Sequence, residues 1–532
     1  MRNFEEPGRS LAISRNAMAA TSHPASTLAA LDILRAGGNA IDAAVGACAV
    51  QCVVEAGSTG IGGDCFALIA KEGSDQVIGY NGSGRTPAAA HLEWYRQQGF
   101  DNIPRQSPHA VTVPGAVEAW TRLNKDHGRM GLKDILAPAI AYARDGYALT
   151  PRVARDLSLQ AELLSKDTTA SATFLVDGKA PAPGSTQSQP LLADTLEAIG
   201  QEGAGAFYLG EIAGDMVTYL RDLGGLHTIE DFAAARGEYA KPVRATYRDH
   251  TVVECAPNGQ GIIALLILAI LERSSIAGDP LSVDNLHREI EATRLAYWVR
   301  DHILADPDYA DVPVAHVLSA RFIDNLVARI DLSRALPLDG TPPLAGAEHQ
   351  DTVYISVVDK DRNAVSFINS IFHPYGSGLM SPRSGVLLHN RAQSFVLKPG
   401  HPNAMGPSKR PMHTIIPGML TRNGRVTMPF GVMGGHYQAM GHAHLLSKVL
   451  DHGMDLQSAI DLPRLFPLPG TNTVEIEGRL RGAVGPALEA RGFKVKPPAW
   501  AIGGAQAIWI DWETGNLLGG SDPRKDGCAL GY

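Results

Sequence analysis

The chain has 532 residues, of which 45% are hydrophobic and 19% charged, as in ordinary globular proteins rather than disordered or fibrous ones. Its formal charge of −8 comes from 47 basic and 55 acidic residues scattered along the chain, which argues against nucleic acid as a partner. The five cysteines form no C-x-x-C pair, the start lacks a basic and then apolar leader, and no apolar run could span a bilayer, so we expect a cytoplasmic protein without membrane anchor.

The first two-thirds of the chain is predicted to be rich in helix. Residues 26–55 are mostly Ala, Leu, Val and Ile, and a Gly37-Gly38 turn divides them into two buried helices. A glycine-rich run at residues 58–64 then precedes a predicted strand at residues 65–70. Because glycine has no side chain, this run lets backbone or ligand approach closely. Further helices are predicted at residues 115–124, 132–145, 192–202 and 261–273.

Beyond about residue 350 the pattern changes to paired strands. Three pairs of β-type runs flank polar turns and predict hairpins, at residues 353–358 with 364–368, 414–421 with 425–430, and 507–512 with 517–518. The Pro-containing stretch 339–350 has no helical pattern and is expected to be a linker.

Several short motifs follow one another along almost the whole chain. They are GGNAIDAA (37–44), GIGG (60–63), PG (114–115), ARDG (143–146), DPD (306–308), SVVD (356–359), NAV (363–365), GSG (376–378), GVLL (385–388), KRP (409–411), GG (434–435) and SDPR (521–524). Each is weak alone, but in this order they resemble the γ-glutamyltransferase family, whose precursors are cut before a Thr that begins the first strand of the small subunit. Here that residue is Thr352, which local sequence alone would present as an ordinary strand residue.

The resemblance implies a fold and a processing step. The fold is α+β, a four-layer αββα sandwich of the N-terminal nucleophile hydrolase type, formed jointly by both fragments of a self-cleaved precursor. The cut falls between Asp351 and Thr352, so residues 1–351 form a large, helix-rich subunit and residues 352–532 a small subunit that starts at the nucleophile. We expect no cofactor and no metal, and the resemblance leaves open a dimer of such pairs.

The family's chemistry explains why the cut matters. An internal threonine hydroxyl is a poor nucleophile, whereas an N-terminal threonine carries its own base, an α-amino group with an ordinary pKa of roughly 7.7 to 8.0. The hydroxyl attacks an amide carbonyl, and water then hydrolyses the acyl-enzyme; an acceptor amine in place of water would make the enzyme a transferase. By their place in the family, Gly434 and Gly435 supply the N–H groups of an oxyanion hole and Ser370 lies beside the nucleophile. A tight turn and a plain strand serine are the alternative interpretations.

The positions that hold the γ-glutamyl group in most members of the family carry other residues here. The carboxylate-binding arginine is replaced by Ser83, and the nearest arginine, Arg85, is displaced by two residues. The other substrate-contacting positions carry Phe372, Arg391 and Ser394 for the Asn, Gln and Asp that hold the α-ammonium, and His413 and Thr414 for a pair of serines. The last two can still donate hydrogen bonds.

Arg391 changes which substrate is expected. Unit charges about 4 Å apart near a protein surface interact by on the order of 4 kcal/mol, repulsively when their signs match. An ammonium group beside Arg391 is therefore disfavoured, and we expect an acyl group that carries a carboxylate bound by Arg391, Arg85 or both. The alternative is that either arginine is paired with an internal acid.

These features resemble the branch of the family that includes oxamate amidohydrolases, glutathione-hydrolase-like proteins and glutaryl-type acylases. Oxamate, a small amide with a carboxylate beside the scissile carbonyl, suits an arginine-lined pocket well. Hydrolysis or transfer on glutathione-like γ-glutamyl substrates, a glutaryl-type acylase, and an uncut relative that binds without catalysis remain the alternatives.

A metal hydrolase is the rival enzyme class, because His436, His442 and His444 lie close together in the sequence. On a helix, however, residues 442 and 444 would point about 200° apart, and the chain has no H-E-x-x-H motif. This pattern does not favour a metal site.

Overall fold

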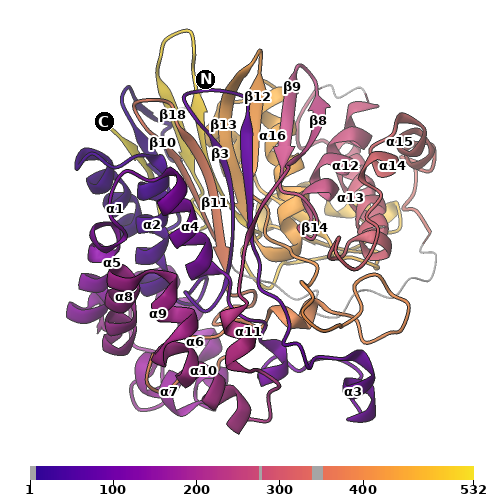
Figure 1. Cartoon of the computed structure of the whole chain (residues 1–532). Helices are drawn as coiled ribbons and strands as arrows, with labels where there is room; N and C mark the ends of the chain where they lie inside the picture. Colours follow the sequence, from indigo (N-terminus) through magenta and orange to yellow (C-terminus); the bar gives the residue numbers. More distant parts are fainter. Residues whose placement is uncertain (1–7, 275–277, 338–351) are drawn as a thin grey trace.

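The computed structural model describes residues 8–274, 278–337 and 352–532. The predicted linker at residues 339–350 and Asp351 lie outside the described residues. Within them, two antiparallel sheets of seven strands each face one another between two layers of helices (Figure 1). The predicted α+β four-layer sandwich is therefore confirmed.

One sheet has the strand order β19-β2-β10-β11-β3-β4-β7. Its strands are β2 (Met18–Ala20), β3 (Asp64–Ala70), β4 (Val77–Gly82), β7 (Glu238–Ala240), β10 (Val353–Val358), β11 (Ala364–Ser370) and β19 (Ala529–Gly531). The strands β10 and β11, from after residue 351, lie between β2 and β3, from before it, so both parts of the chain are needed to build the sheet.

The other sheet has the order β1-β18-β17-β13-β12-β9-β8. Its strands are β1 (Ala12–Ser14), β8 (Val243–Tyr247), β9 (His250–Glu254), β12 (Gly418–Arg422), β13 (Arg425–Met433), β17 (Gly504–Ile510) and β18 (Leu517–Ser521). The three predicted hairpins are confirmed as β10–β11, β12–β13 and β17–β18. The strand predicted at 414–421 begins later, at Gly418, because residues 413 and 414 bond instead to the loop before residue 261.

The helices of the first layer cover the sheet that contains β10 and β11. They include the predicted pair, α1 (Pro24–Arg35) and α2 (Ala40–Val54), and also α4 (Ala116–His127), α5 (Leu132–Asp145), α6 (Pro151–Leu164), α7 (Thr168–Phe174), α8 (Pro190–Glu202), α9 (Ala204–Leu209), α10 (Glu211–Asp222) and α11 (Ile229–Ala233). Every residue of α2 is buried, and its start is closed by a capping box between Asn39 and Asp42. The predicted Gly37-Gly38 turn is confirmed, with Gly37 at a φ of 103° that favours glycine.

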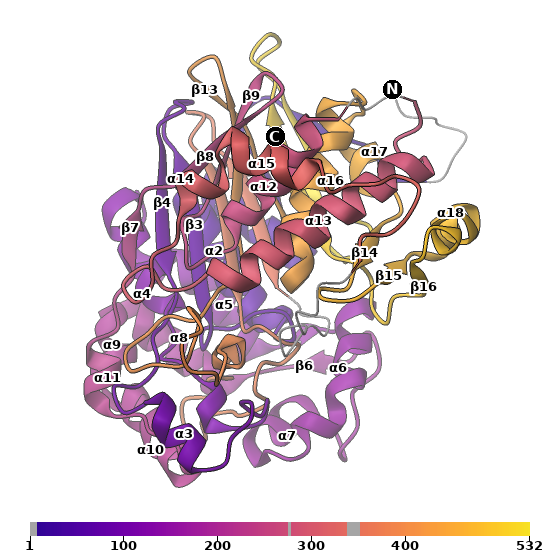
Figure 2. The ribbon, with the colours of Figure 1, turned by 90° about the vertical axis from the view of Figure 1, so that its right-hand side faces the viewer.

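The second helical layer covers the sheet that contains β12 and β13 (Figure 2). It is formed by α12 (Gly261–Glu272), α13 (Val283–Ile303), α14 (Val314–Val317), α15 (Ala320–Val327), α16 (Gln438–Leu450) and α17 (Leu456–Asp461). Smaller elements complete the described chain: α3 (Leu92–Gln97), a two-stranded sheet of β5 (Tyr147–Ala148) and β6 (Thr186–Gln187), and α18 (Gly478–Ala490) beside β14 (Leu465–Pro467), β15 (Thr473–Ile476) and β16 (Lys494–Lys496).

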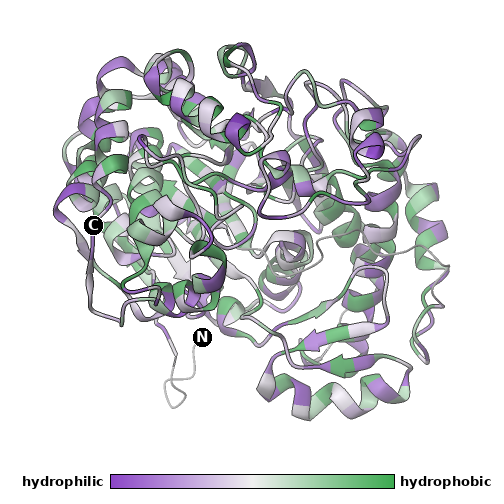
Figure 3. Cartoon of the chain, turned by 90° about the horizontal axis from the view of Figure 1, so that it is seen from below, coloured by the Kyte–Doolittle hydropathy of each residue, from purple (hydrophilic) through white to green (hydrophobic). Residues whose placement is uncertain are grey.

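Side chains of β10 alternate between two cores. Ile355 and Val357 pack with the α2 side chains, whereas Ser356 faces the other sheet and donates to the Pro429 carbonyl of β13 at 3.1 Å. Seen from below, hydrophobic and hydrophilic residues occur together on the outer helices, as expected for helices with one buried face (Figure 3). No helix in the described ranges is long and apolar enough to cross a membrane.

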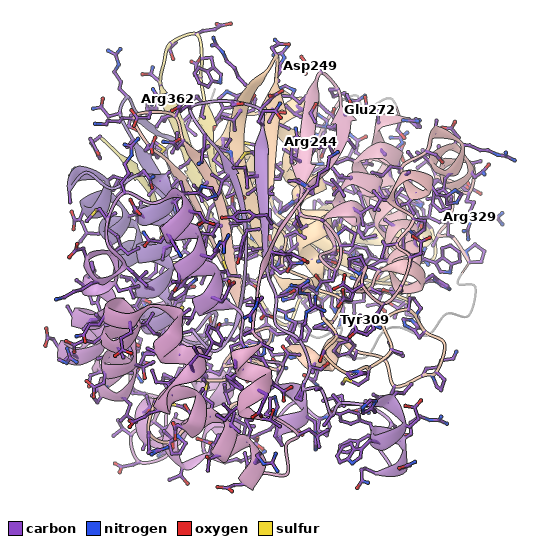
Figure 4. The ribbon with its side chains drawn as sticks, in the orientation of Figure 1. Arg244, Asp249, Glu272, Tyr309, Arg329 and Arg362 are labelled. Carbon is purple, nitrogen blue, oxygen red and sulfur yellow. The ribbon has the colours of Figure 1, made fainter. Side chains whose placement is uncertain are left out.

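The turn between β10 and β11 lies at one end of the sandwich, and Ser370, the last residue of β11, lies at the other end. At the turn, Arg362 donates to the carbonyl groups of Arg15, Asn16 and Gly515 at 2.7–3.2 Å (Figure 4). The turn is thus fixed to both terminal regions of the chain, and the start of β10 and the end of β11 lie together at the opposite end.

Candidate active site

Thr352 lies directly before β10 and beside the end of β11. The strand register pairs Val353 with Asn369, which brings Thr352 opposite Ser370. The Thr352 hydroxyl donates to the Ser370 hydroxyl at 3.2 Å, and Nε2 of Gln438 lies 3.5 Å from the same Thr352 oxygen. Both hydroxyl residues are buried, so this contact is shielded from solvent.

Ser370 connects Thr352 to a buried arginine. Its hydroxyl oxygen accepts from the backbone N–H of Phe372 at 2.9 Å and from Nη2 of Arg391 at 3.2 Å. Nη1 of Arg391 donates to the Thr414 hydroxyl at 3.0 Å, and its guanidinium lies 4.2 Å from the centre of the Phe372 ring. The structure therefore brings Thr352, Ser370, Arg391 and Thr414, predicted from distant parts of the sequence, into one connected group.

The charge of Arg391 is balanced by a carboxylate that the sequence analysis did not identify. Asp64, at the start of β3, has Oδ2 3.9 Å from Nε of Arg391 and accepts from Nε2 of His413 at 2.9 Å. Its Oδ1 accepts from the backbone N–H groups of Gly84 at 2.9 Å and Gly115 at 3.3 Å. All three side chains are fully buried.

Burial and charge oppose each other in this group. Burial alone would raise the pKa of Asp64, but the surrounding His389, His413 and Arg391 outweigh it and hold the pKa at about 2. Burial, with the charge of Arg391, lowers the pKa of His413 to about 3. Burial lowers the pKa of Arg391 to about 9, against the effect of Asp64, which leaves the guanidinium charged at neutral pH. At that pH the group holds one anion, one cation and neutral imidazoles.

The proton of neutral His413 is placed by its neighbours. Nδ1 of His413 accepts from the backbone N–H of Ile415 at 3.4 Å, so Nε2 carries the hydrogen that is donated to Asp64. The predicted hydrogen-bonding role of His413 is thus directed at an internal carboxylate.

Gly434 and Gly435 lie between β13 and α16. Their φ angles are 120° and 56°, in the region that favours glycine. The carbonyl of Gly435 accepts from Nε2 of Gln260 at 3.1 Å, and Gln438, the first residue of α16, also contacts Thr352. The Gly434-Gly435 turn is therefore close in sequence to Gln438, whose side chain contacts the Thr352 hydroxyl.

Two other predicted site residues stand apart from this group. Arg85 forms ion pairs with Asp306 at 3.2 Å and Asp308 at 2.7 Å, and its side chain is 30% exposed. The hydroxyl of Tyr309, the residue after Asp308, donates to the Pro407 carbonyl at 2.6 Å (Figure 4). Ser394 is buried, and its hydroxyl has no hydrogen-bond partner among the residues the structure describes.

The three histidines of the rival metal interpretation have separate partners. His442 contacts Glu254 at 2.7 Å, His444 contacts Glu289 at 2.9 Å, and His436 accepts from Arg300 at 2.9 Å. In the ranges 8–274, 278–337 and 352–532, no three His, Cys, Asp or Glu side chains are grouped to hold a metal ion. Each of the three histidines thus contacts a different charged side chain, and these contacts do not bring the histidines together.

Comparison with known proteins agrees with this geometry. A family model described as gamma-glutamyltranspeptidase matches residues 26–532. Over 528 residues the chain is 37% identical to the glutathione hydrolase-like YwrD proenzyme of Bacillus subtilis (strain 168), covering 98% of this chain and 99% of the relative. It is 36% identical over 533 residues to the oxamate amidohydrolase proenzyme of Klebsiella pneumoniae subsp. pneumoniae, with 98% and 99% covered.

A solved structure extends the likeness to three dimensions. The crystal structure of cephalosporin acylase from Bacillus halodurans matches with a TM-score of 0.93 and 37% identity, covering 100% of this chain and 99% of that one. The resemblance inferred from the ordered motifs is confirmed, and the chain belongs to the gamma-glutamyltranspeptidase family of amide-hydrolysing and amide-transferring enzymes.

Proposed function

We propose that this protein is a self-processing amide hydrolase in which Thr352 becomes the N-terminal nucleophile, and that its substrate is a small amide bearing a carboxylate, such as oxamate. The observation that carries the proposal is the chain of hydrogen bonds from the Thr352 hydroxyl through Ser370 to the guanidinium of Arg391. This chain of hydrogen bonds supports the proposal because it links the hydroxyl proposed as nucleophile to a cation that could bind a carboxylate.

Processing comes first. The Thr352 hydroxyl attacks the carbonyl carbon of Asp351, the resulting ester is hydrolysed by water, and the α-amino group of Thr352 is freed. The strand that follows Thr352 is paired with β11 on one side and β2 on the other. Thr352 therefore keeps its place when the bond before it is broken.

Turnover then uses the new amino group as base. It accepts the hydroxyl proton, the threonine oxygen attacks the amide carbon, and the N–H groups of Gly434 and Gly435 stabilise the oxyanion. The amine returns the proton to the leaving nitrogen as the C–N bond breaks, which releases ammonia from oxamate. Water then hydrolyses the acyl ester of Thr352, giving oxalate and the free enzyme.

The position of Arg391 favours a short acyl group. The Ser370 hydroxyl oxygen lies 3.2 Å from Nη2 of Arg391 and 3.2 Å from the Thr352 hydroxyl oxygen. The distance between Nη2 and the Thr352 oxygen therefore cannot exceed the sum of these two lengths. A carboxylate at this guanidinium lies close to the carbon under attack. Oxamate meets that condition, because its carboxylate is bonded to the amide carbon, whereas several carbons separate the two groups in γ-glutamyl and glutaryl amides.

Of the two candidate arginines, Arg391 is the one we propose for substrate. Arg85 is paired with two carboxylates, whereas Arg391 is paired with one, Asp64, and its Nε has no hydrogen-bond partner in the described part of the chain. The nearest carboxylate, that of Asp64, lies 3.9 Å from this Nε. The buried N–H is a donor that a substrate carboxylate can satisfy, and leaving it unsatisfied costs about 1–3 kcal/mol.

The substrate is tested with purified, cut protein and three amides: oxamate, a glutaryl amide and a γ-glutamyl anilide. We expect kcat/KM to be highest for oxamate and lowest for the γ-glutamyl anilide, whose ammonium meets Arg391. Turnover of the γ-glutamyl anilide as fast as that of oxamate would contradict the charge argument, and preference for the glutaryl amide would assign the acylase alternative.

A further inference from the structure

One buried amide, that of Gln260, joins the Gly434-Gly435 turn to the segment that binds Arg391. Nε2 of Gln260 donates to the carbonyl oxygens of Thr414 at 2.7 Å and Gly435 at 3.1 Å. Its Oε1 accepts from Nη1 of Arg300 at 3.2 Å. Because carbonyls only accept and a guanidinium only donates, these contacts permit a single orientation of the amide.

A second set of contacts supports the same turn from α13. Nη1 of Arg300 also donates to Nδ1 of His436 at 2.9 Å, and the hydroxyl of Tyr297 donates to the His436 carbonyl. Arg300 is itself held by Asp301, whose carboxylate accepts from Nε at 2.8 Å. On the α13 side, therefore, Gln260 contacts a charged side chain, that of Arg300, which is itself held by hydrogen bonds.

The turn needs such support because of its composition. Two successive glycines have more backbone freedom than any other pair, yet N–H groups stabilise an oxyanion well only when they are oriented before the reaction. Within the turn, the Gly435 carbonyl accepts from the backbone N–H of Gln438. Gln260 supplies its link to a different part of the chain.

We propose that Gln260 is a positioning residue, whose side chain fixes the Gly434-Gly435 turn relative to the Thr414 segment so that oxyanion donors and Arg391 keep one spacing. The inference rests on the proposed function, since it takes the turn as the oxyanion hole. Gln260 touches no reacting atom in this scheme and acts through the two carbonyls that it holds.

The proposal predicts a specific kinetic signature. Gln260→Met keeps the size of the side chain and removes both donated bonds. The Thr414 segment stays in place because backbone bonds remain, from Gln260 N–H to the His413 carbonyl and from His413 N–H to the Asn258 carbonyl, both at 2.9 Å. We therefore expect kcat per cut molecule to fall roughly 10–100-fold, less than the ~100–1,000-fold loss of an oxyanion donor itself, with KM changed by no more than about 3-fold.

Gln189→Met is the matched control. Gln189 is also buried, and its Nε2 donates to the Val53 carbonyl at 2.7 Å, away from the site. It should lose a comparable amount of thermal stability and keep wild-type kcat. Gln260→Glu, which keeps the acceptor for Arg300 but cannot donate to the carbonyls, should reproduce the kcat loss of Gln260→Met.

The outcomes separate the two levels of inference. A kcat for Gln260→Met within about 2-fold of wild type, or an equal loss in Gln189→Met, overturns the positioning role. The role is also overturned when both Gln260 variants stay uncut while Gln189→Met is cut normally, because Gln260 is then needed for folding or processing instead. Cut wild-type protein that hydrolyses no carboxylate-bearing amide contradicts the proposed function, whatever the variants do.

Discussion

The hydroxyl of Thr352 donates to the hydroxyl of Ser370 at 3.2 Å, across the antiparallel strands β10 and β11. Ser370 also accepts from Arg391, so its oxygen faces one donor that we propose as nucleophile and one that we propose as substrate-binding cation. Because β10 and β11 form a hairpin of neighbouring strands, the register of that hairpin alone determines that Thr352 and Ser370 meet.

Ser370→Ala tests this contact. The substitution removes the acceptor shared by Thr352 and Arg391, and we expect kcat/KM to fall roughly 10–100-fold, with a stability loss of about 1–3 kcal/mol from buried donors left unpaired. Ser377→Ala is the control, because Ser377 is also buried and donates to the Leu388 carbonyl at 2.7 Å. Equal activity losses in both variants would show that Ser370 has only a structural role.

Arg391→Met and Arg85→Met separate the two arginines. If Arg391 binds the substrate carboxylate, its loss should lower kcat/KM for oxamate by about 100-fold or more, mainly through KM, since a buried charge-assisted pair contributes several kcal/mol. Arg391→Lys keeps the charge but replaces the separate Nη1 and Nη2 donors to Thr414 and Ser370 by a single ammonium nitrogen, so it should rescue activity only in part. Steady-state kinetics in which Arg85→Met is the more impaired variant would transfer the role to Arg85.

Gly63→Ala tests how closely the glycine motif must pack against β11. A Cβ at Gly63 would lie 2.3 Å from the carbonyl oxygen of Ser370, so the end of the strand has to shift. We expect both self-cleavage and turnover to fall at least about 10-fold, because small displacements of reacting groups cost large factors in rate. Gly214→Ala, in α10 where a Cβ meets nothing within 4 Å, should keep activity and gain about 0.5–1 kcal/mol of stability. Normal processing of Gly63→Ala would argue that this approach is not required.

Acid sensitivity should arise partly from buried neutral histidines. Burial lowers the pKa of His227 from 6.5 to about 4, so between these pH values the unfolded chain binds a proton that the folded chain excludes. Its contribution is complete above pH 6.5 and is lost as pH falls through 4, by a total on the order of 3 kcal/mol.

The matching variant is His227→Gln, which cannot titrate but can still donate to the Val111 carbonyl that His227 contacts at 2.9 Å. Its melting temperature should fall less than that of wild type between pH 7 and pH 5. Parallel curves for the two proteins would remove His227 from the explanation.

The parts of the fold that sequence predicted are those with local patterns. The α1–α2 pair and the three hairpins each consist of neighbours in the chain, so periodicity and turn residues are enough to identify them. The order of strands in the sheets depends on pairings between residues far apart in the chain, such as those of β11 with β3, and no local pattern reports them. The 21-residue helix α13 was not predicted, because its buried face carries charged residues, among them Glu289 and Arg300.

In the candidate site, the missed residues are buried polar ones. Asp64, Gln260 and Gln438 have types that are usually exposed, and only the tertiary structure shows that they are enclosed and hydrogen-bonded. Of these three, only Asp64 could have been suspected from the sequence, because it is an acidic residue placed between a glycine-rich run and an apolar strand. Thr352 was identified through family resemblance, since Thr at the head of a strand is ordinary.

The central claim is that Thr352 becomes an N-terminal nucleophile, and mass spectrometry of the purified protein tests it most directly. We predict two chains, residues 1–351 and 352–532, with an acyl adduct on the peptide that begins at Thr352 when oxamate turnover is quenched, and one uncut, inactive chain for Thr352→Ala. An intact chain of 532 residues that still hydrolyses amides, or an adduct on any other peptide, would contradict the claim.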